Sequence, residues 1–231
     1  MNIATLSLSY MRARPWNTVL ILLLLALGTA TITLLLLASA QLEDRMMRDA
    51  LGIDLVIGAK GSPLQLVLSS VYHLDVPTGN IPLTEAKAIA KRKPLVKQTI
   101  PMSLGDSYQG FRIVGTEHAY VALYEGKAAQ GRLWTKSMEA VLGADVAVRT
   151  GLGIGGRFTG SHGLELGGDH HGDHPYSVVG VLARTGTVLD RIVLTSLESV
   201  WDVHAKAHTP QGGRPTPLVE EEKEITALLV R

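Results

Sequence analysis

The sequence contains no cysteine and few aromatic residues. Without cysteine among its 231 residues, the chain cannot form disulfides, thiolate metal sites, iron–sulfur clusters or a cysteine nucleophile. Phenylalanine, tryptophan and tyrosine make up only 5% of the chain, and they are not interleaved with runs of lysine and arginine. The formal net charge is +1, so neither charge nor pattern favours nucleic-acid binding. We therefore expect no nucleic-acid partner.

Charged residues are also missing from one long segment, Pro15 to Leu42. Within it, Val19 to Ala40 is almost wholly apolar or small and has no polar face. As an α-helix this run would span roughly 33 Å, which matches the hydrocarbon core of a bilayer. The sequence therefore predicts one transmembrane helix at 16–42, preceded by a cytoplasmic lead at 1–15.

A cleavable signal peptide is the alternative interpretation of this N-terminal segment. Arg12 and Arg14 would form its basic region, and Ala38–Ala40 matches the small-residue pattern before a cleavage site. The apolar run is longer than the usual core of a signal peptide, so we favour an uncleaved anchor. The positive-inside rule only slightly favours a cytoplasmic N-terminus, because Arg45 and Arg48 follow the other end of the helix.

After the apolar segment, short strand-like and helix-like patterns alternate irregularly. The expected strands are Ile53–Ile57, Val96–Pro101, Phe111–Thr116, Ala140–Leu142, Arg157–Thr159, Tyr176–Leu182, Arg191–Thr195 and Ile225–Arg231. The expected helices are Glu43–Ala50, as a stalk, then one capped by Thr84 and running towards Pro94, His118–Tyr124, Ala144–Thr150 and Ser196–Ala205. The apolar run Leu64–Leu74 stays open between the two types. We predict an α+β, mixed domain at 43–208, followed by a linker and last strand at 209–231.

Three motifs share letters with catalytic or nucleotide-binding patterns but lack the required context. GLGIGG at 151–156 follows a predicted helix and precedes a strand, whereas a dinucleotide fingerprint needs the reverse order. GAKGS at 58–62 lacks the spacing of a phosphate-binding loop. Triad residue types occur nearby, but no nucleophile elbow accompanies them; they are Ser69, Ser70, His73 and Asp75. We predict neither an ATP site nor a hydrolase site.

The stretch SHGLELGGDHHGDHP, residues 161–175, holds four of the eight histidines. Imidazole and carboxylate groups are ligands for zinc and copper, so the stretch is a candidate metal site. Its candidate ligands are His162, Asp169, His170, His171, Asp173 and His174. Glycine and proline exclude a helix here, and we expect a long hairpin loop between the flanking strands. The other interpretation is a solvated loop without metal.

The other histidines are expected to play lesser parts. His204 and His208 follow the next predicted strand and could approach the His-rich loop. His73 and His118 are expected to be ordinary polar residues of the surface or core. Any metal site therefore depends on the loop.

The order of these segments resembles the FtsX/MacB-like family of ABC transporter permeases. After the apolar helix come DLVIGAKGSPLQLVLSSVYHLDVPTGNI, then VLGADVAVRTGLGIGGRF, and then YSVVGVLARTGTVLDRIVLTSLESVW. The second phrase resembles the strand–helix–glycine–strand unit of the MacB-like periplasmic core domain. The third resembles the strand, loop and helix that close that domain. The resemblance covers essentially the whole chain.

This resemblance implies a permease subunit that is not itself an enzyme and has no catalytic residues. Such permeases carry four membrane helices, dimerise, and work with a separate cytoplasmic ATPase that binds the ATP. The large domain faces the periplasm from the bacterial inner membrane and meets substrates or partner proteins. The chain ends at Arg231, where a second membrane helix would be approached, so we expect it to be the first part of such a subunit. A membrane-tethered periplasmic zinc-binding protein is the alternative, followed by a secreted enzyme whose signal peptide resembles an anchor.

Overall fold

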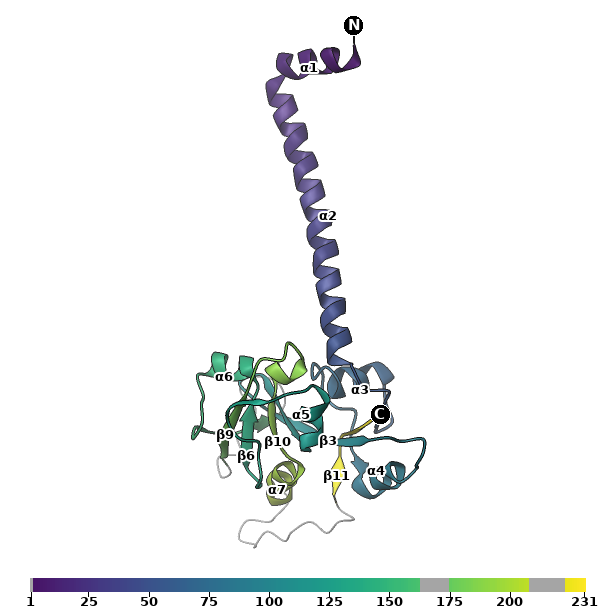
Figure 1. The fold of residues 1–231 in the computed structure, drawn as a ribbon, viewed down its shortest axis with the longest axis vertical. Helices are drawn as coiled ribbons and strands as arrows, with labels where there is room; N and C mark the ends of the chain where they lie inside the picture. Colours follow the sequence, from purple (N-terminus) through teal and green to yellow (C-terminus); the bar gives the residue numbers. More distant parts are fainter. Residues whose placement is uncertain (1, 163–174, 208–222) are drawn as a thin grey trace. The chain divides into compact units, whose positions relative to one another are not determined.

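The structure is a computed structural model that describes residues 2–162, 175–207 and 223–231. It divides the chain into two compact units, Met1–Met46 and Met47–Arg231. Each unit is described by itself below. The second unit, called the domain, contains the sheet and all the strands drawn in Figure 1.

The first unit consists of α1 (Ile3–Ala13) and most of α2 (Pro15–Asp49). Arg14 separates them, because a residue before proline avoids the helical region, and its φ and ψ are −132° and 67°. Pro15 then starts α2, where its missing N–H costs nothing. The lead expected at 1–15 is thus mostly helical. The stalk predicted at Glu43–Ala50 is confirmed as a helix almost to its end.

Among the described residues, α2 is the helix that is long and apolar enough to cross a membrane. Its most apolar window has a mean hydropathy of 2.7 and is not buried within the protein. Three threonine hydroxyls on the helix donate to backbone carbonyls one turn earlier, with Thr31 and Thr33 doing so at 2.8 Å and Thr29 at 3.0 Å. These bonds satisfy hydroxyl groups that lipid could not. The finding rests on length and composition, which a signal sequence near the N-terminus shares.

The domain is built on one mixed sheet. Its strands lie in the order β1-β12-β3-β4-β10-β6-β9-β5, with β7 added to β9 and β8 added to β3, while β2 and β11 pair separately. Their bounds are β1 (Leu55–Gly58), β2 (Ile81–Pro82), β3 (Thr99–Tyr108), β4 (Phe111–Thr116), β5 (Ala128–Gly131), β6 (Glu139–Leu142), β7 (Arg157–Phe158), β8 (Ser161–His162), β9 (Tyr176–Leu182), β10 (Val193–Ser196), β11 (Glu224–Ile225) and β12 (Ala227–Val230). The pairs β4/β10 and β6/β9 are parallel, and the other described pairs are antiparallel.

Both faces of the central strands are buried. On β4, Ile113 and Val114 belong to two different hydrophobic clusters, and on β10, Val193 and Leu194 divide in the same way. Successive side chains of a strand point to opposite faces, so this division places a core on each side of the sheet. A third cluster, which includes Leu83 and Leu228, lies where β12 and β11 meet the helix that follows β2.

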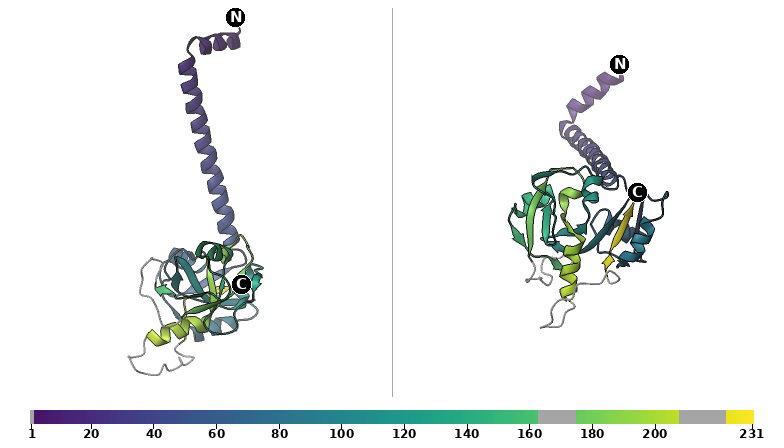
Figure 2. Two further views of the ribbon diagram at one scale, coloured as in Figure 1. Left: turned by 90° about the vertical axis from the view of Figure 1, so that its left-hand side faces the viewer. Right: turned by 60° about the horizontal axis from the view of Figure 1, so that its bottom comes forward.

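Short helices connect and cover the strands. They are α3 (Pro63–Ser70), α4 (Leu83–Ala90), α5 (His118–Leu123), α6 (Ala144–Thr150), the 3-10 helix η1 (Val188–Arg191) and α7 (Leu197–Ala207). The last of these, yellow-green in Figure 2, packs against β3, β4 and β10. The open run at 64–74 is resolved as α3, with Pro63 at its first turn and the Ser62 hydroxyl accepting from the backbone N–H of Gln65.

The prediction of an α+β fold with one N-terminal apolar helix is confirmed. Strands β4 and β9 have the bounds that alternation predicted, and α6 begins after Gly143 and ends at Gly151. Gly151 has a φ of 70°, the left-handed conformation that glycine adopts at a helix C-terminus. Strand β7 follows this turn, so GLGIGG joins a helix to a strand and does not form a dinucleotide fingerprint.

Two local predictions are wrong. The strand predicted to end at Pro101 continues as β3 to Tyr108, and only Gln109 and Gly110 form the turn before Phe111. Both turn residues have positive φ, 48° and 82°, as a two-residue hairpin connection requires. A bulge between Leu104 and Ser107 accommodates the glycine and aspartate inside the strand. Thr84 does not cap α4, which begins one residue earlier at Leu83 without a side-chain cap.

Candidate functional site

The candidate functional site lies where the two parallel strands β4 and β10 end. Thr116 and Ser196, their last residues, are paired in register. The carboxyl ends of parallel strands meet at one edge, and here each strand is followed by a helix, α5 and α7. Glu117 precedes α5 and Glu198 stands in the first turn of α7, so the sequence brings two acidic side chains to this edge.

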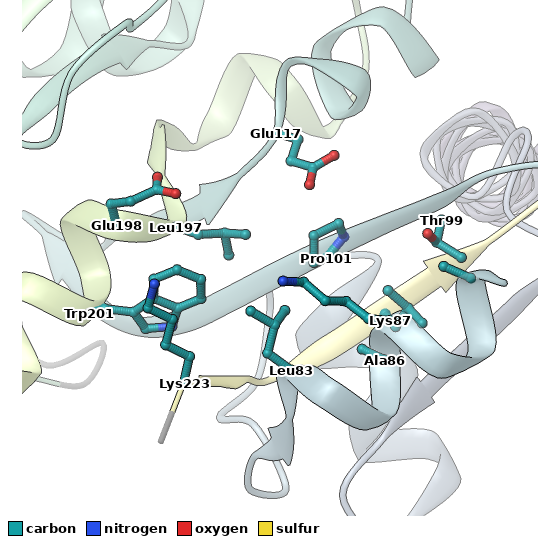
Figure 3. A pocket seen from close by; sticks show the side chains of 12 residues that line it. Leu83, Ala86, Lys87, Thr99, Pro101, Glu117, Leu197, Glu198, Trp201 and Lys223 are labelled. Carbon is teal, nitrogen blue, oxygen red and sulfur yellow. The ribbon is translucent and has the colours of Figure 1, made fainter. Parts of the chain in front are cut away.

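A groove with a volume of about 390 Å³ opens beside these carboxylates (Figure 3). Apolar side chains line part of it, and Leu83, Leu197 and Leu228 belong to the third hydrophobic cluster. The groove therefore has a packed apolar floor with charged groups above it. The complete lining is Leu83, Ala86, Lys87, Ala90, Thr99, Pro101, Glu117, Leu197, Glu198, Trp201, Lys223 and Leu228.

Opposite charges lie on the two sides of this floor. Glu117 and Glu198 form one rim, called the acidic rim, at the start of the helices that follow β4 and β10. Lys87 of α4 and Lys223 before β11 line the other side, called the basic rim. The four charged side chains come from four separate segments of the chain, which the sheet brings together.

Trp201 is held in a fixed position between the two rims. Its indole Nε1 donates to the backbone carbonyl of Glu224 at 2.7 Å, and the Nζ of Lys223 lies 5.0 Å from the centre of its ring. A cation over an indole face is attracted by the negative potential of the ring. The hydrogen bond and the cation together orient the indole, so the apolar wall that it contributes is preformed.

A second hollow of about 670 Å³ continues past the acidic rim. It shares Glu117, Leu197 and Glu198 with the groove, and Trp134 lies on its far side. His118 packs edge-on against Trp134, with ring centroids 4.7 Å apart, and its Nε2 lies 2.8 Å from the carbonyl oxygen of that residue. The acidic rim is thus the middle of a longer depression that both tryptophans of the domain line.

The acidic rim carries charge that nothing described neutralises. Burial, and secondarily the nearby carboxylate of Glu198, raises the pKa of Glu117 above its usual value. In the described part of the chain, neither carboxylate forms an ion pair, whereas Glu139 and Asp145 each pair with an arginine. The rim would be stabilised by an external cation, whereas the leucines of the floor are already buried within the domain.

The predicted metal ligands are only partly within the described structure. His162 lies in β8, opposite Asp106 of β3. The sequence predicted a loop over the whole His-rich stretch, but its first two residues form a strand. Six of these histidines and aspartates lie outside the described residues, namely Asp169, His170, His171, Asp173, His174 and His208, as do the side chains of His162 and His204. The described residues contain no group of three His, Asp or Glu side chains placed to hold a metal ion. The zinc site stays a prediction.

The triad residue types near α3 do not form a catalytic arrangement. The hydroxyl of Ser69 donates to the carbonyl of Leu66 at 3.1 Å, and the Nε2 of His73 lies 2.9 Å from the hydroxyl of Tyr120. Burial, with a contribution from Arg112, lowers the pKa of His73 to about 3, so this imidazole is neutral. His73 is a core residue, as expected, and it is bonded to a tyrosine and not to a serine.

One buried ion pair was not predicted from the sequence. The carboxylate of Asp49, at the end of α2, accepts from the Nη2 of Arg191 at 2.6 Å, and its side chain is only 5% exposed. The hydroxyl of Tyr124 donates to the backbone carbonyl of the same residue. These contacts join positions far apart in the sequence, so no local pattern could have indicated them.

The sequence model of the MacB-like periplasmic core domain matches residues 18–223. The chain belongs to this family. The match includes most of α2 and nearly all of the MacB-like domain, so the resemblance that its phrases predicted is confirmed. The family is a component of ABC-type transporter permeases and not a family of typical enzymes. Together with α2, it indicates a membrane-anchored protein with an extracellular domain.

Two solved structures illustrate what the chain is similar to. The periplasmic region of MacB from Actinobacillus actinomycetemcomitans is 16% identical, with a TM-score of 0.44, over 80% of this chain and 78% of that one. The extracellular domain of YknZ, a noncanonic ABC-type transporter from Gram-positive bacteria, is 12% identical, with a TM-score of 0.44, over 76% and 81%. No curated protein sequence matches the chain significantly. The family assignment rests on the sequence model of the family.

Proposed function

We propose that the chain is the N-terminal part of a permease subunit in an ABC-type transporter or mechanotransmission complex. It moves or regulates a membrane or periplasmic substrate, using ATP that a separate cytoplasmic subunit hydrolyses. The observation that carries this proposal is the family match over residues 18–223, which takes in both the apolar helix and the domain. The chain itself supplies no ATP site and no catalytic residue in this proposal.

The proposal assigns a place to each part of the chain. The lead at 1–15 is cytoplasmic, α2 crosses the bacterial inner membrane, and the MacB-like domain is periplasmic. The subunit acts as a homodimer or beside a second permease subunit, with the ATPase on the cytoplasmic side. Periplasmic partner proteins and substrates meet the domain. No nucleic acid takes part.

In this mechanism, movement of α2 must reach the domain. The ion pair between Asp49 and Arg191 supports this step, because it ties the end of α2 to η1 inside the domain. The Asp49 side chain is buried, so the pair is weakly screened by salt. Tyr124 of the segment after α5 holds the same residue through its backbone. In this proposal, the last turn of α2 is thus secured within the domain, to which Asp49, Tyr124 and Arg191 all belong.

The test reconstitutes the protein in nanodiscs with a candidate cytoplasmic ABC ATPase subunit. Because the chain has no cysteine, Val148→Cys places a single fluorophore on α6, where the side chain is 77% exposed. We expect the fluorescence to change when ATP is added and to return after hydrolysis. An ATPase variant that binds but does not hydrolyse ATP should hold the changed signal.

The matched control removes the attachment. Arg191→Ala should leave ATP hydrolysis nearly intact and should reduce the fluorescence change on α6. If the ATPase neither binds the subunit nor alters the signal, the proposed function is wrong. The DNA after codon 231 gives an independent check, since the proposal expects three further apolar spans in the same reading frame.

A further inference from the structure

The groove between α4, β3 and α7 has three features that together describe an occupant. Its acidic rim lacks a cation among the described residues, its floor is apolar, and its basic rim lies on the opposite side (Figure 3). Elsewhere on the domain, Glu139 is paired with Arg132 at an Nη2–Oε1 distance of 2.5 Å, and Asp145 is paired with Arg184. The groove is thus a place where charge is left for another molecule to match.

We propose that this groove docks a peptide segment of an extracytoplasmic partner protein. The segment carries lysine or arginine next to a large apolar residue. Its basic group lies beside Glu117 and Glu198, and its apolar side chain packs against the half-buried Trp201, above the buried Leu83 and Leu197. This inference rests on the proposed function for the presence of such a partner, but it can be tested without the ATPase.

The size of the groove sets how much of a partner it holds. About 390 Å³ accommodates one or two large side chains, which is the scale of a pocket for an anchor residue and not of a whole helix. The continuation past Glu198, lined by Trp134 and Lys136, would accept residues further along the segment. A short extended segment with one apolar anchor therefore fits better than a globular surface.

The charge arrangement fixes the sign of the partner. Two carboxylates of like charge repel, and after burial this repulsion is the second cause that raises the pKa of Glu117. A partner cation relieves the repulsion and lies partly out of water, where charge pairs are stronger. An acidic segment would instead face both carboxylates. The only favourable charge contacts for an acidic segment would be with the basic rim, Lys87 and Lys223. There, Lys223 already lies over the Trp201 ring.

The experiment uses the full chain in nanodiscs of zwitterionic lipid. Ala90→Cys places an environment-sensitive fluorophore in the groove, and Val148→Cys places the same fluorophore on α6, away from it. The probes are the peptide Ac-LKALKL-NH2, its charge-reversed form Ac-LEALEL-NH2, and Ac-SKASKS-NH2, which lacks the apolar anchors. Empty nanodiscs measure binding to lipid.

We expect Ac-LKALKL-NH2 to shift the Ala90→Cys signal with saturation and to leave the Val148→Cys signal unchanged. The acidic peptide and the anchor-free peptide should bind at least about tenfold more weakly. Glu117→Gln with Glu198→Gln should weaken the basic peptide by a similar factor. Glu117→Lys with Glu198→Lys should reverse the preference between the basic and acidic peptides. Glu117 and Glu198 are exposed, and unfolding curves of the variants check that each of them folds.

Equal binding of the basic and acidic peptides would overturn the proposal, as would unchanged binding after both glutamates become glutamine. An equal response at the two fluorophore positions would also overturn it, since that result means nonspecific association. These outcomes leave ATP-driven movement of the domain untouched. Failure of this inference and failure of the proposed function are therefore distinguishable.

Discussion

His73 shows how one residue can belong to a buried polar chain without belonging to an active site. Its ring meets the Tyr120 ring edge-on at 6.2 Å, and the Tyr120 ring in turn meets Tyr124 at 5.4 Å. His73 itself has a φ of 55°, which is uncommon for a residue other than glycine. The sequence shows that a histidine lies in this segment, but it does not show that its partner is Tyr120, which comes from α5.

The first prediction concerns the pH dependence of stability that His73 causes. Between pH 6.5 and about 3, this histidine binds a proton in the unfolded chain but not in the folded domain. Stability is therefore complete above pH 6.5 and falls on acidification by about 1.4 kcal/mol per pH unit within that window. His73→Asn, which tolerates positive φ, should flatten the slope by one proton between pH 6.5 and 4.5 in urea unfolding.

Tyr120→Phe is the matched control, because it removes the same hydrogen bond but keeps the imidazole. It should lower stability while preserving the slope. Glu139 does not interfere, since the Arg132 hydrogen bond lowers its pKa from 4.5 to about 2 and its contribution is lost only below the chosen window. Identical slopes for the parent chain and His73→Asn would contradict this account.

The second prediction concerns zinc and the His-rich stretch. If the imidazoles of His170, His171 and His174 form a site, calorimetry should detect zinc binding tighter than about 10 µM. Replacing these three residues with alanine should abolish it. Binding should also weaken below about pH 6, because imidazole must be neutral to bind metal. Absent binding, or binding that survives the triple replacement, would leave the stretch as a solvated connection.

At the scale of elements, prediction succeeded where a local pattern and the tertiary contacts agree. Strand β9 alternates buried and half-buried residues along its length, so its period could be read directly. The predicted strand ended at Pro101, well before the end of β3 at Tyr108, because Gly105, Asp106 and Ser107 have the composition of a turn. Pairing with β4 and β8 keeps them extended, which is information carried by residues far away in the sequence.

The third prediction tests a close approach between α6 and η1. A Cβ on Gly143 would lie 2.2 Å from the carbonyl oxygen of Leu189 and 2.5 Å from that of Asp190. Since backbone must move to relieve this overlap, Gly143→Ala should lower the free energy of unfolding by about 1–3 kcal/mol. Gly153→Ala is the control, because a Cβ there meets no atom within 4 Å. It should change stability by less than about 0.5 kcal/mol, and equal losses would contradict the packing argument.

At the scale of the whole molecule, the family could be predicted from the sequence, whereas the groove could not. The phrases that carry the resemblance are continuous in the chain, and the family match confirms them. The groove is lined from α4, β3, the start of α5, α7 and the residue before β11. Nothing in the sequence links Lys87 to Glu198 until the strands are ordered. The sequence alone therefore could not identify Glu117 and Glu198 as neighbours, although each stands at the start of a helix.

The fourth prediction concerns the N-terminal anchor. If α2 is an uncleaved membrane helix, the 231-residue chain expressed by itself and extracted from membranes should retain its N-terminal lead and have a mass near 24.8 kDa. Intact mass spectrometry and N-terminal sequencing measure this directly. A mature chain that begins at Gln41 would show removal of a signal peptide and would contradict the anchor.

The two contacts of Asp49 also determine how freely this residue can move inside the domain. A single contact would leave it free to rotate about that contact. Here Arg191 holds the side chain and Tyr124 holds the backbone of one residue, from two different parts of the domain. Together they restrict the rotation of Asp49 as well as its displacement. Loss of either partner should therefore loosen this residue without releasing it completely.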